Sequence, residues 1–399
     1  MTKLLDLKNN SVIAINQKNY TKEDNYKKVC YLDTDNITNN RINAFLKIDL
    51  TKEKLPSRAK RKCSLNSIIY SSVRPNQRHF GIIKEIPKNF LVSTAFIVID
   101  IIDLKKLDPD YLYYYITQDK ITHYLQRIAE CGTSSYPSIT PLDFLNIKIK
   151  LYPLETQQKI ARTLSVLDQK IENNHKINEL LHKILELLYE QYFVRFDFLD
   201  ENNKPYQTSG GKMKFSKELN RLIPSGWSVR FLNHKIVSTY QPKTISKTLL
   251  NDSYSYSVYG GGGIIGRFTE YNHEQSEFII SCRGQCGISY LTLPKSWITG
   301  NAMVIRPTKS YTSKTYLYHT IKKYKLTKYI TGSVQPQITR QNLSTMPILI
   351  PKRKTLNKWN NISSLLWNLI HNNMQSTQTL TALRDFLLPL LLKQQVKPK

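Results

Sequence analysis

The sequence predicts an α+β protein in which two similar mixed α/β modules are joined and spaced by two long helices that form an antiparallel coiled coil. The first observation is an internal repeat, because Pro137–Thr140 returns as Pro336–Thr339 and Ile171–Asn174 returns as Ile370–Asn373, both at an offset of 199 positions. The second is that both copies end in a long amphipathic stretch. An ungapped repeat of this length indicates a duplicated unit and predicts pseudo-two-fold symmetry.

The first module, residues 1 to about 150, has the pattern of short strands and loops with one helix. Ser67–Tyr70 and Phe90–Ile99 are rich in β-branched and aromatic residues and are bounded by turn residues. Pro109 is placed to open a helix through the aromatic stretch Tyr111–Tyr115. At helical spacing we expect these tyrosines to pack in a core, with stacking on bases as the alternative.

The second module repeats these features at a drifting offset of 209, then 207, 205 and finally 199. Length differences therefore accumulate in loops, which indicates a shared scaffold with variable loops. Asp200–Gly211 is polar and turn-rich, and we expect it to separate the central helix from the second module. The matched segments are Ile69–Arg74 with Phe278–Arg283, Ser93–Val98 with Gly300–Ile305, and Tyr111–Tyr113 with Tyr316–Tyr318. The expected domains are a first module (1–152), a central helix (153–198), a second module (199–352) and a distal helix with tail (353–399).

The long helices are expected at about 155–195 and 354–392, with apolar residues at steps of three and four. We favour pairing of the two helices over separate packing of each on its own module. Asn174 and Asn373 are repeat-equivalent and interrupt both stripes, so we expect them to lie within a few residues of each other across an antiparallel seam. The first stripe is Ile160, Leu164, Leu167, Ile171, Asn174, Ile177, Leu181, Ile184 and Leu188; the second is Leu366, Ile370, Asn373, Leu380, Leu383 and Leu387.

Composition favours a polyanionic partner. An apolar fraction of 40% over 399 residues is typical of a globular chain with two or three domains. The formal net charge of +28 is typical of proteins that bind nucleic acid or an acidic membrane surface. The alternative is a lysine-rich, solvated surface with no such partner.

Cysteine usage and hydropathy predict a cytoplasmic protein. The five cysteines are odd in number and scattered, which argues against a disulfide framework. Cys282 and Cys286 form the only close pair, and without a second pair we expect no zinc site. Met1–Asp6 has no apolar core of a signal peptide, and Phe386–Leu392 is far shorter than the ~20 residues that a membrane span needs.

Catalytic motifs are missing from the sequence. The chain contains no Pro-Pro, and hence no Asn/Asp-Pro-Pro-aromatic motif of amino-methyltransferases. Gly261–Gly266 has the glycine spacing of a phosphate loop, but Arg267-Phe268 follows in place of Lys-Ser/Thr. This loop is either a flexible β-turn or a backbone-close DNA loop. Asp168 and Lys170 are expected to form a solvated charge pair. We therefore expect no catalytic residue, cofactor or metal.

DNA-binding candidates follow from side-chain chemistry. Phosphates are bound by cations without regard to sequence, whereas bases are read by Arg on guanine and by Asn or Gln on adenine. A basic run suits phosphates, although a solvated surface is its alternative: Arg58, Lys60, Arg61 and Lys62. The first candidates for base contacts are Arg74, Asn76, Gln77 and Arg78 in the first module and Arg283 and Gln285 in the second. The next candidates are Gln335, Gln337, Thr339 and Arg340, with Ser134, Ser135 and Tyr136 as their first-module counterparts. Arg267, beside the glycine loop, is a further candidate.

Several stretches resemble the specificity subunits of type I restriction-modification systems. Pro153–Ile171 with Tyr192–Asp197 is similar to the central spacer of that family, and Ile223–Trp227 is similar to its module-opening signature. The remaining matches are Leu55–Arg61 with Ser72–Asn76, similar to one class of target-recognition domain, and Thr331–Ile338, similar to the module-closing loop. Two departures are the missing Pro-x-Gly-Trp opening in the first module and a distal helix poor in charge.

The resemblance implies a non-catalytic subunit with two target-recognition domains, one for each half of a split site in double-stranded DNA. It also implies two methyltransferase subunits on the helices, motor-nuclease subunits in the full complex, and adenine as the methylated base. Unequal loops predict unequal half-sites, so the site should not be a palindrome. The rivals are a single-chain methyltransferase or nuclease with an unrecognised site, and a basic scaffold that binds membrane or nucleic acid without specificity.

Overall fold

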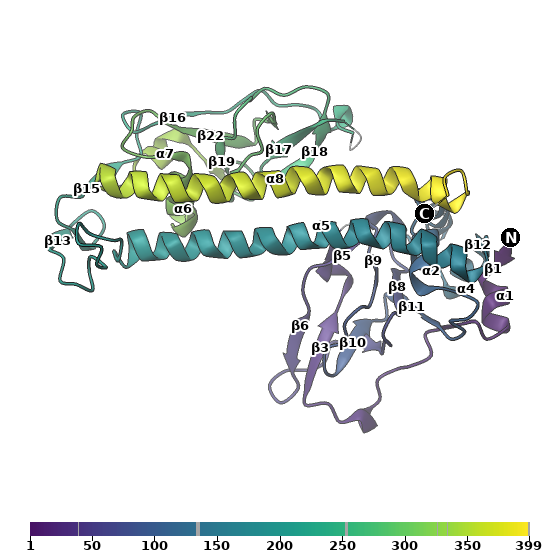
Figure 1. The fold of residues 1–399 in the computed structure, drawn as a ribbon. Coiled ribbons are helices and arrows are strands. Elements are labelled where there is room, and N and C mark those ends of the chain that lie inside the picture. Colours follow the sequence, from purple (N-terminus) through teal and green to yellow (C-terminus); the bar gives the residue numbers. More distant parts are fainter. Residues whose placement is uncertain (39, 133–135, 252–253, 325, 333, 398–399) are drawn as a thin grey trace. The chain divides into compact units, whose positions relative to one another are not determined.

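The computed structural model describes residues 1–38, 40–132, 136–251, 254–324, 326–332 and 334–397. The chain divides into two compact units, with unit 1 formed by Met1–Glu172 and Thr377–Lys399 and unit 2 by Asn173–Ser376. Helices α5 (Leu154–Tyr189) and α8 (Arg353–Leu392) each pass from one unit into the other (Figure 1). Each unit therefore contains one module and a part of both long helices.

Unit 1 contains two four-stranded sheets. The first has the order β2-β11-β8-β9 and is antiparallel throughout; the second has the order β6-β3-β10-β7, with β3 and β10 parallel. Strands Ile68–Ser71 (β8) and Phe90–Ser93 (β10) are buried along their whole length, which explains their continuous apolar sequence. The other strands are β2 (Ile13–Ile15), β3 (Lys28–Leu32), β4 (Ile37–Thr38), β5 (Arg41–Ile42), β6 (Leu46–Asp49), β7 (Ala59–Arg61), β9 (Phe80–Ile82) and β11 (Phe96–Ile101).

Helices cover the first sheet of unit 1, and their number corrects the sequence prediction of a single helix. Helix α2 (Pro109–Ile116) begins at Pro109 as predicted, and its tyrosines are buried in the core. The others were missed because α1 and α4 have only five or six residues and α3 has no capping signal from its side chains. They are α1 (Leu4–Asn9), α3 (Asp119–Glu130) and α4 (Pro141–Leu145); β1 (Thr2–Lys3) pairs with β12 (Lys148–Ile149).

Unit 2 repeats this plan with a four-stranded sheet in the order β16-β22-β19-β20 and a three-stranded sheet in the order β18-β17-β21. Gly261 and Gly262 form the turn between β17 and β18, so the glycine loop is the tip of a β-hairpin. The strands are β16 (Val237–Tyr240), β17 (Tyr256–Gly260), β18 (Gly263–Phe268), β19 (Phe278–Ser281), β20 (Ser289–Leu291), β21 (Trp297–Ile298) and β22 (Ala302–Pro307).

The remaining elements of unit 2 frame its core. The stretch after α5, expected as a linker, is rich in turns but packs on the unit, because the Phe198 ring stacks on both Tyr206 and Trp227 with centroids 4.9 and 5.1 Å apart. The elements are a hairpin of β13 (Met213–Ser216) and β14 (Arg221–Pro224), the pair β15 (Ser228–Phe231) and β25 (Pro347–Ile350), the pair β23 (Ile330–Thr331) and β24 (Gln337–Ile338), and helices α6 (Lys314–Lys323) and α7 (Arg340–Ser344).

Matching hydrogen bonds fix which residues of the two units are equivalent. The Tyr111 hydroxyl donates to the Lys150 carbonyl at 2.5 Å, and the Tyr316 hydroxyl donates to the Leu349 carbonyl at 2.6 Å. The predicted equivalence of α2 with α6 is therefore correct. The strand prediction was one residue out of register: the Ser72 amide donates to the Ala95 carbonyl as the Cys282 amide donates to the Asn301 carbonyl, which gives offsets of 210 and 206 in place of 209 and 207. The sequence missed this because the residues on either side are uniformly apolar.

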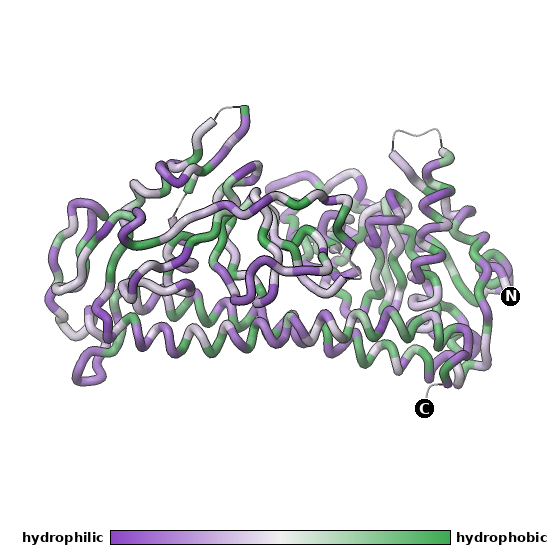
Figure 2. The backbone as a smooth tube through the Cα atoms, turned by 90° about the horizontal axis from the view of Figure 1, so that it is seen from above, coloured by the Kyte–Doolittle hydropathy of each residue, from purple (hydrophilic) through white to green (hydrophobic). Residues whose placement is uncertain are grey.

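The long helices run antiparallel to each other within each unit. In unit 1, the Asp168 carboxylate of α5 pairs with Arg384 of α8 at 2.8 Å, so Asp168 is not part of a solvated pair with Lys170 as the sequence predicted. In unit 2, the Asn174 side chain donates to the Asn373 carbonyl at 3.5 Å, and the Asn373 side chain donates to Asn178 Oδ1 at 2.8 Å. The two repeat-equivalent asparagines are thus in contact. Hydrophobic and hydrophilic residues alternate along both helices (Figure 2).

The buried face of the helices departs from the predicted stripe in three places. Ile177 and Ile184 are exposed on α5, and Leu383 is exposed on α8. The prediction used the 3.5-residue repeat of a coiled coil, whereas the buried positions on α5 follow the 3.6-residue period of a straighter helix. Leu185 and Tyr189 therefore take the buried places expected for Ile184 and Leu188. The other predicted seam residues are buried or half-buried: Ile160, Leu164, Leu167, Ile171, Asn174, Leu181, Leu366, Ile370, Asn373, Leu380 and Leu387.

Candidate nucleic-acid interface

Two loops meet in the same way in both units. We name the loop that follows the buried central strand the post-strand loop (72–79 in unit 1, 282–288 in unit 2). The loop that precedes the short helix is the closing loop (described at 132 and 136–139 in unit 1, and at 332 and 334–338 in unit 2). In unit 1 the Ile139 amide donates to the Ser72 carbonyl at 2.8 Å; in unit 2 the Ile338 amide donates to the Cys282 carbonyl at 3.0 Å. A β-bridge adjoins each bond, Val73 to Ser138 and Arg283 to Gln337, so loops distant in sequence form one surface.

In unit 2 these loops line an open cleft of about 490 Å³. Arg283, Gln335 and Gln337 were predicted separately as base-reading residues, and all three line this cleft with exposed side chains. Guanidinium and carboxamide groups are the donors and acceptors that match guanine and adenine edges in the major groove. The cleft also contains Val334, Pro336 and Gly284, which the sequence reasoning did not select.

In unit 1 the corresponding surface has different chemistry. The Arg74 guanidinium carbon lies 5.5 Å from the centroid of the Tyr136 ring, and both side chains are exposed. Asn76 and Gln77 are also exposed, in a 3₁₀ turn that follows Arg74. Arg78 forms an ion pair with Asp119 at 2.9 Å, so its charge is partly neutralised within the protein. Ser134 and Ser135 lie outside the described residues.

The basic run splits into two outward and two inward residues. Arg58 and Lys60 are exposed beside and on strand β7, as a phosphate contact requires. Arg61 donates to Asn16 and to the Phe96 carbonyl, and its burial lowers its pKa. Lys62 pairs with Asp24 at 2.5 Å, and this hydrogen bond raises the pKa of Lys62. Strand alternation turns Arg61 to the face opposite Lys60, and the ion pair with Asp24 occupies Lys62, so only the outward pair remains available for DNA.

The other candidates of unit 2 also divide. Gln285 and Arg340 are exposed, whereas Thr339 caps helix α7 by accepting from the Asn342 amide at 3.1 Å. Thr140 caps α4 in unit 1 in the same manner, which explains why the repeat retains threonine at this position. Arg267 in β18 donates to the Ser255 carbonyl and is half-buried, so it stabilises the β17–β18 hairpin.

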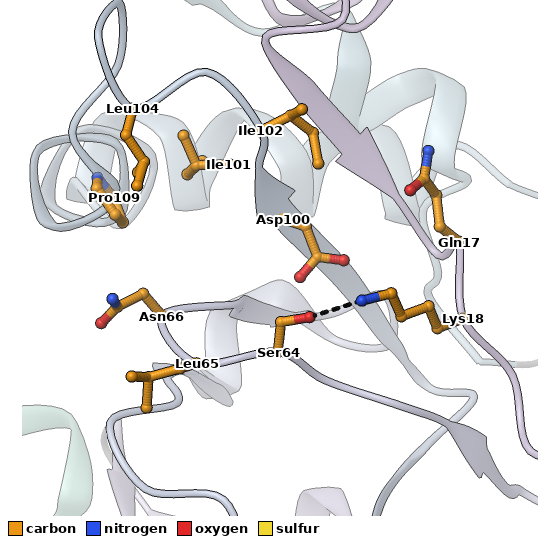
Figure 3. A pocket seen from close by; sticks show the side chains of 10 residues that line it. All are labelled: Gln17, Lys18, Ser64, Leu65, Asn66, Asp100, Ile101, Ile102, Leu104 and Pro109. Carbon is orange, nitrogen blue, oxygen red and sulfur yellow. Dashed lines mark hydrogen bonds between the residues drawn. The ribbon is translucent and has the colours of Figure 1, made fainter.

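A second cavity, of about 140 Å³, lies in unit 1 at the other end of β8 from the post-strand loop (Figure 3). Lys18 Nζ donates to Ser64 Oγ at 3.1 Å across it, and the buried Asp100 carboxylate accepts from Ser67. None of the predicted DNA-binding residues lines this cavity. It therefore stands apart from the loop surface.

The described part of the chain contains neither a metal-binding cluster nor a helix that could cross a membrane. No group of three or more His, Cys, Asp or Glu side chains is placed to hold a metal ion. Cys282 is buried and contacts backbone carbonyls, and Cys286 Sγ lies 3.1 Å from the Pro336 carbonyl oxygen. Within the same described residues, no helix combines the length and the apolar character that a membrane crossing requires.

Comparison with known proteins identifies the family. The family model described as the type I restriction modification DNA specificity domain matches residues 6–183 and 224–383, one match in each half of the repeat. The chain belongs to this family. It is a specificity subunit of a type I restriction-modification system, which is the DNA-recognition component and not a catalytic one.

Two of the matches extend over nearly the whole chain. The HindI specificity subunit of Haemophilus influenzae is 23% identical, with 93% of this chain and 95% of the relative covered. The MjaIX specificity subunit of Methanocaldococcus jannaschii is 24% identical over 71% of this chain and 68% of the relative. The crystal structure of a type I restriction-modification S subunit from M. genitalium has a TM-score of 0.57 at 15% identity, covering 98% of this chain and 95% of that one, so the fold is shared.

Proposed function

We propose that each unit of this specificity subunit reads one half of a split, non-palindromic site in double-stranded DNA. The observation that carries the proposal is the paired loop surface, which has the same backbone bonds in both units and different exposed side chains. Equal scaffolds give each unit the same means of approach to DNA. Unequal side chains give each unit a different preferred sequence.

The two surfaces differ in the bases that they suit. In unit 2, Gln335 and Gln337 provide carboxamides, which pair with N6 and N7 of adenine, and Arg283 suits O6 and N7 of guanine. In unit 1, Arg74 is the strongest candidate, because its guanidinium is oriented over Tyr136. Arg58 and Lys60 contribute phosphate contacts that carry no sequence information. The proposed recognition domains are residues 1–152 and 199–352, the central helix is 153–198, and the distal helix with its tail is 353–399.

Methyltransferase subunits are the proposed partners of the long helices, with motor-nuclease subunits joining the full complex. The relatives are named as subunits of type I restriction enzymes, and this chain brings no catalytic motif of its own. The part of α5 in unit 2 exposes Ile177, Leu180, Ile184 and Leu187 at steps of three and four, which is one face of a helix. An apolar stripe on an exposed helix is typical of a protein interface. We propose adenine as the methylated base and the cytoplasm as the location.

The test is adenine-methylation sequencing of cells that express this chain with its methyltransferase, against cells with the methyltransferase alone. The expected result is one bipartite, non-palindromic motif that needs this chain. Absence of any new motif from cells that contain the assembled complex would contradict the proposal, and so would a palindromic motif.

The helix partner is tested separately. Leu180→Glu with Leu187→Glu should abolish copurification with the methyltransferase, because two charges would have to be buried in an apolar interface. The matched control is Leu222→Glu, on the exposed β13–β14 hairpin of the same unit. Unchanged assembly of the double variant would exclude this stripe as the docking surface.

A further inference from the structure

Val334 is the most exposed of the large apolar side chains in the described residues, with 91% of its surface accessible. Single exposed apolar residues are common on protein surfaces, so exposure alone does not make a site. The surroundings of Val334 are what distinguish it. The side chain lines the cleft of unit 2 together with Gln335, Gln337 and Arg283, which are groups suited to base edges.

The backbone presents this valine in a defined way. Gly332 has a φ of +88°, and a Cβ atom at that position would lie 2.5 Å from the Gln335 carbonyl oxygen. Only glycine allows this turn without displacing the loop. On the other side of Val334, the bridge between Arg283 and Gln337 and the contact of Cys286 Sγ with the Pro336 carbonyl join the loop to its neighbour. Val334 and Gln335 therefore lie between a glycine in the left-handed conformation and a segment that is held to the post-strand loop.

Base-pair chemistry supplies a partner for an apolar group in such a place. A carboxamide reads adenine through N6 and N7, and the thymine of an A·T pair carries its 5-methyl group in the same major groove. That methyl is the apolar feature among the base edges, and contact with it is how apolar side chains read sequence. Valine suits the contact, because its two methyl groups are held by a stiff χ1.

We infer that Val334 packs against the 5-methyl group of a thymine in the half-site read by unit 2. The contact makes an A·T pair a requirement at one position, next to or within the pair read by Gln335. This inference rests on the proposed function and adds the base-pair class to it. Val334 is a specificity-determining residue, and its effect depends on one methyl group of the DNA.

The test uses the full chain bound to its methyltransferase, with duplexes in which each thymine of that half-site is replaced singly by uracil. Uracil pairs as thymine does and lacks only the methyl group. One replacement should weaken binding by the wild-type complex roughly three- to fivefold, the effect of losing one buried methyl group. The same replacement should leave binding by the Val334→Ala complex unchanged. Val334→Ile, which keeps the contact, and Leu222→Ala, remote from the cleft, should retain the wild-type sensitivity.

Four outcomes would count against the inference. If no uracil replacement weakens wild-type binding, or if Val334→Ala stays sensitive to the uracil replacement, Val334 does not contact a thymine methyl group. The proposed function still holds in both cases, provided that the complex binds its site selectively. An affinity loss in Val334→Ala that is the same with thymine and uracil would indicate insertion between base steps and would overturn the methyl contact. If the complex binds a scrambled duplex as tightly as the site, the proposed function fails and the inference fails with it.

Discussion

The two units use different chemistry at the same position of their shared scaffold. In unit 1, the Tyr114 hydroxyl donates to Asp168 at 2.6 Å, and Arg384 completes the group with its ion pair to the same carboxylate at 2.8 Å. The repeat-equivalent residues of unit 2 are His319, Trp367 and Leu185. There the His319 and Trp367 rings pack with centroids 6.4 Å apart, and Leu185 is fully buried.

The difference shows that the scaffold accepts either a satisfied charge network or an aromatic cluster where α2 or α6 meets the long helices. A half-buried ion pair is tolerated when every charge has a partner, and an apolar cluster of similar size replaces it without loss. The two units can therefore diverge independently in sequence, provided that each buried charge in a unit keeps a partner within that unit. The same independence is what two separate readers of DNA require.

The largest expected effect concerns the charge network of unit 1. Asp168→Ala should lower the free energy of unfolding of unit 1 by about 3 kcal/mol, because Arg384 would keep a largely buried charge without its main partner. Hydrogen exchange in α2 would measure the loss. All four tryptophans lie in unit 2, so tryptophan fluorescence should report a much smaller change.

A double variant sharpens this prediction. Asp168→Leu with Arg384→Leu imitates the apolar chemistry of unit 2 and should restore most of the lost stability. If the double variant were as unstable as Asp168→Ala, the ion pair would stabilise unit 1 by more than an apolar pair can. The charge network of unit 1 and the apolar cluster of unit 2 would then not be equivalent in stability.

The next effect is a pH dependence that should be strongest in unit 2. Burial lowers the pKa of His319 to about 3 and that of His371 to about 4. Because the unfolded chain binds these protons near pH 6.5 and the folded unit does not, stability is complete above pH 6.5 and falls as the pH drops toward 4. At pH 5 the loss should be about 2 kcal/mol for His319 alone.

Urea unfolding followed by tryptophan fluorescence at pH 8 and pH 5 would measure this effect. His319→Phe should remove the contribution of this histidine to the loss of stability at low pH, so the pH dependence should become flatter. An unchanged slope in that variant would mean that His319 is not the group that resists protonation.

Base reading should separate the units most clearly. Gln335→Ala should cost about 1–2 kcal/mol on the half-site of unit 2 and nothing on that of unit 1. Arg74→Ala should show the reverse pattern. Binding to duplexes with single base-pair changes in either half would measure both, and equal losses across the two halves would deny that the units read independently.

The smallest effect is expected from phosphate contacts. Lys60→Ala should weaken binding to all sequences alike and reduce the slope of log K against log salt by about 1. Lys62→Ala is the matched control, because Lys62 is already paired with Asp24 and should leave the slope unchanged. Salt titrations of both variants would decide whether outward orientation is what matters in the basic run.

Much of the fold could be predicted from local sequence patterns. The repeat, the start of α5, the bounds of α8, the start of α2 at Pro109 and the contact of Asn174 with Asn373 all follow from periodicity and from residue types with strong positional preferences. The α-helical part of α5 ends at Tyr189, short of the predicted end near 195, and a π-helical turn continues it over Glu190–Val194. Apolar stripes fixed the helices but not their rotation, since Ile177 and Ile184 face solvent while Leu185 is buried. A change from a 3.5- to a 3.6-residue period shifts a face gradually, and one sequence does not show which period applies.

The candidate site was predictable in composition but not in geometry. Arg283, Gln335 and Gln337 were chosen by chemical type, and the structure brings them to one cleft. Arg61, Arg78 and Thr339 have the same chemical types but are used inside the protein, through contacts with Asn16, Asp119 and the α7 amides. The contacts of Arg61 and Arg78 join residues far apart in the chain, so a single sequence cannot separate them from DNA contacts, whereas the Thr339 cap is local. Val334 gave no signal except its place in the closing-loop motif.

The most direct test of two independent readers is adenine-methylation sequencing of cells that carry the chain with the closing loop of unit 2 altered, as Gln335→Ala with Gln337→Ala. A parallel culture would carry Arg74→Ala in unit 1. The account predicts that the first variant relaxes one half of the bipartite motif and the second relaxes only the other half. If either variant changed both halves together, or if both variants changed the same half, the two units would not be separate readers.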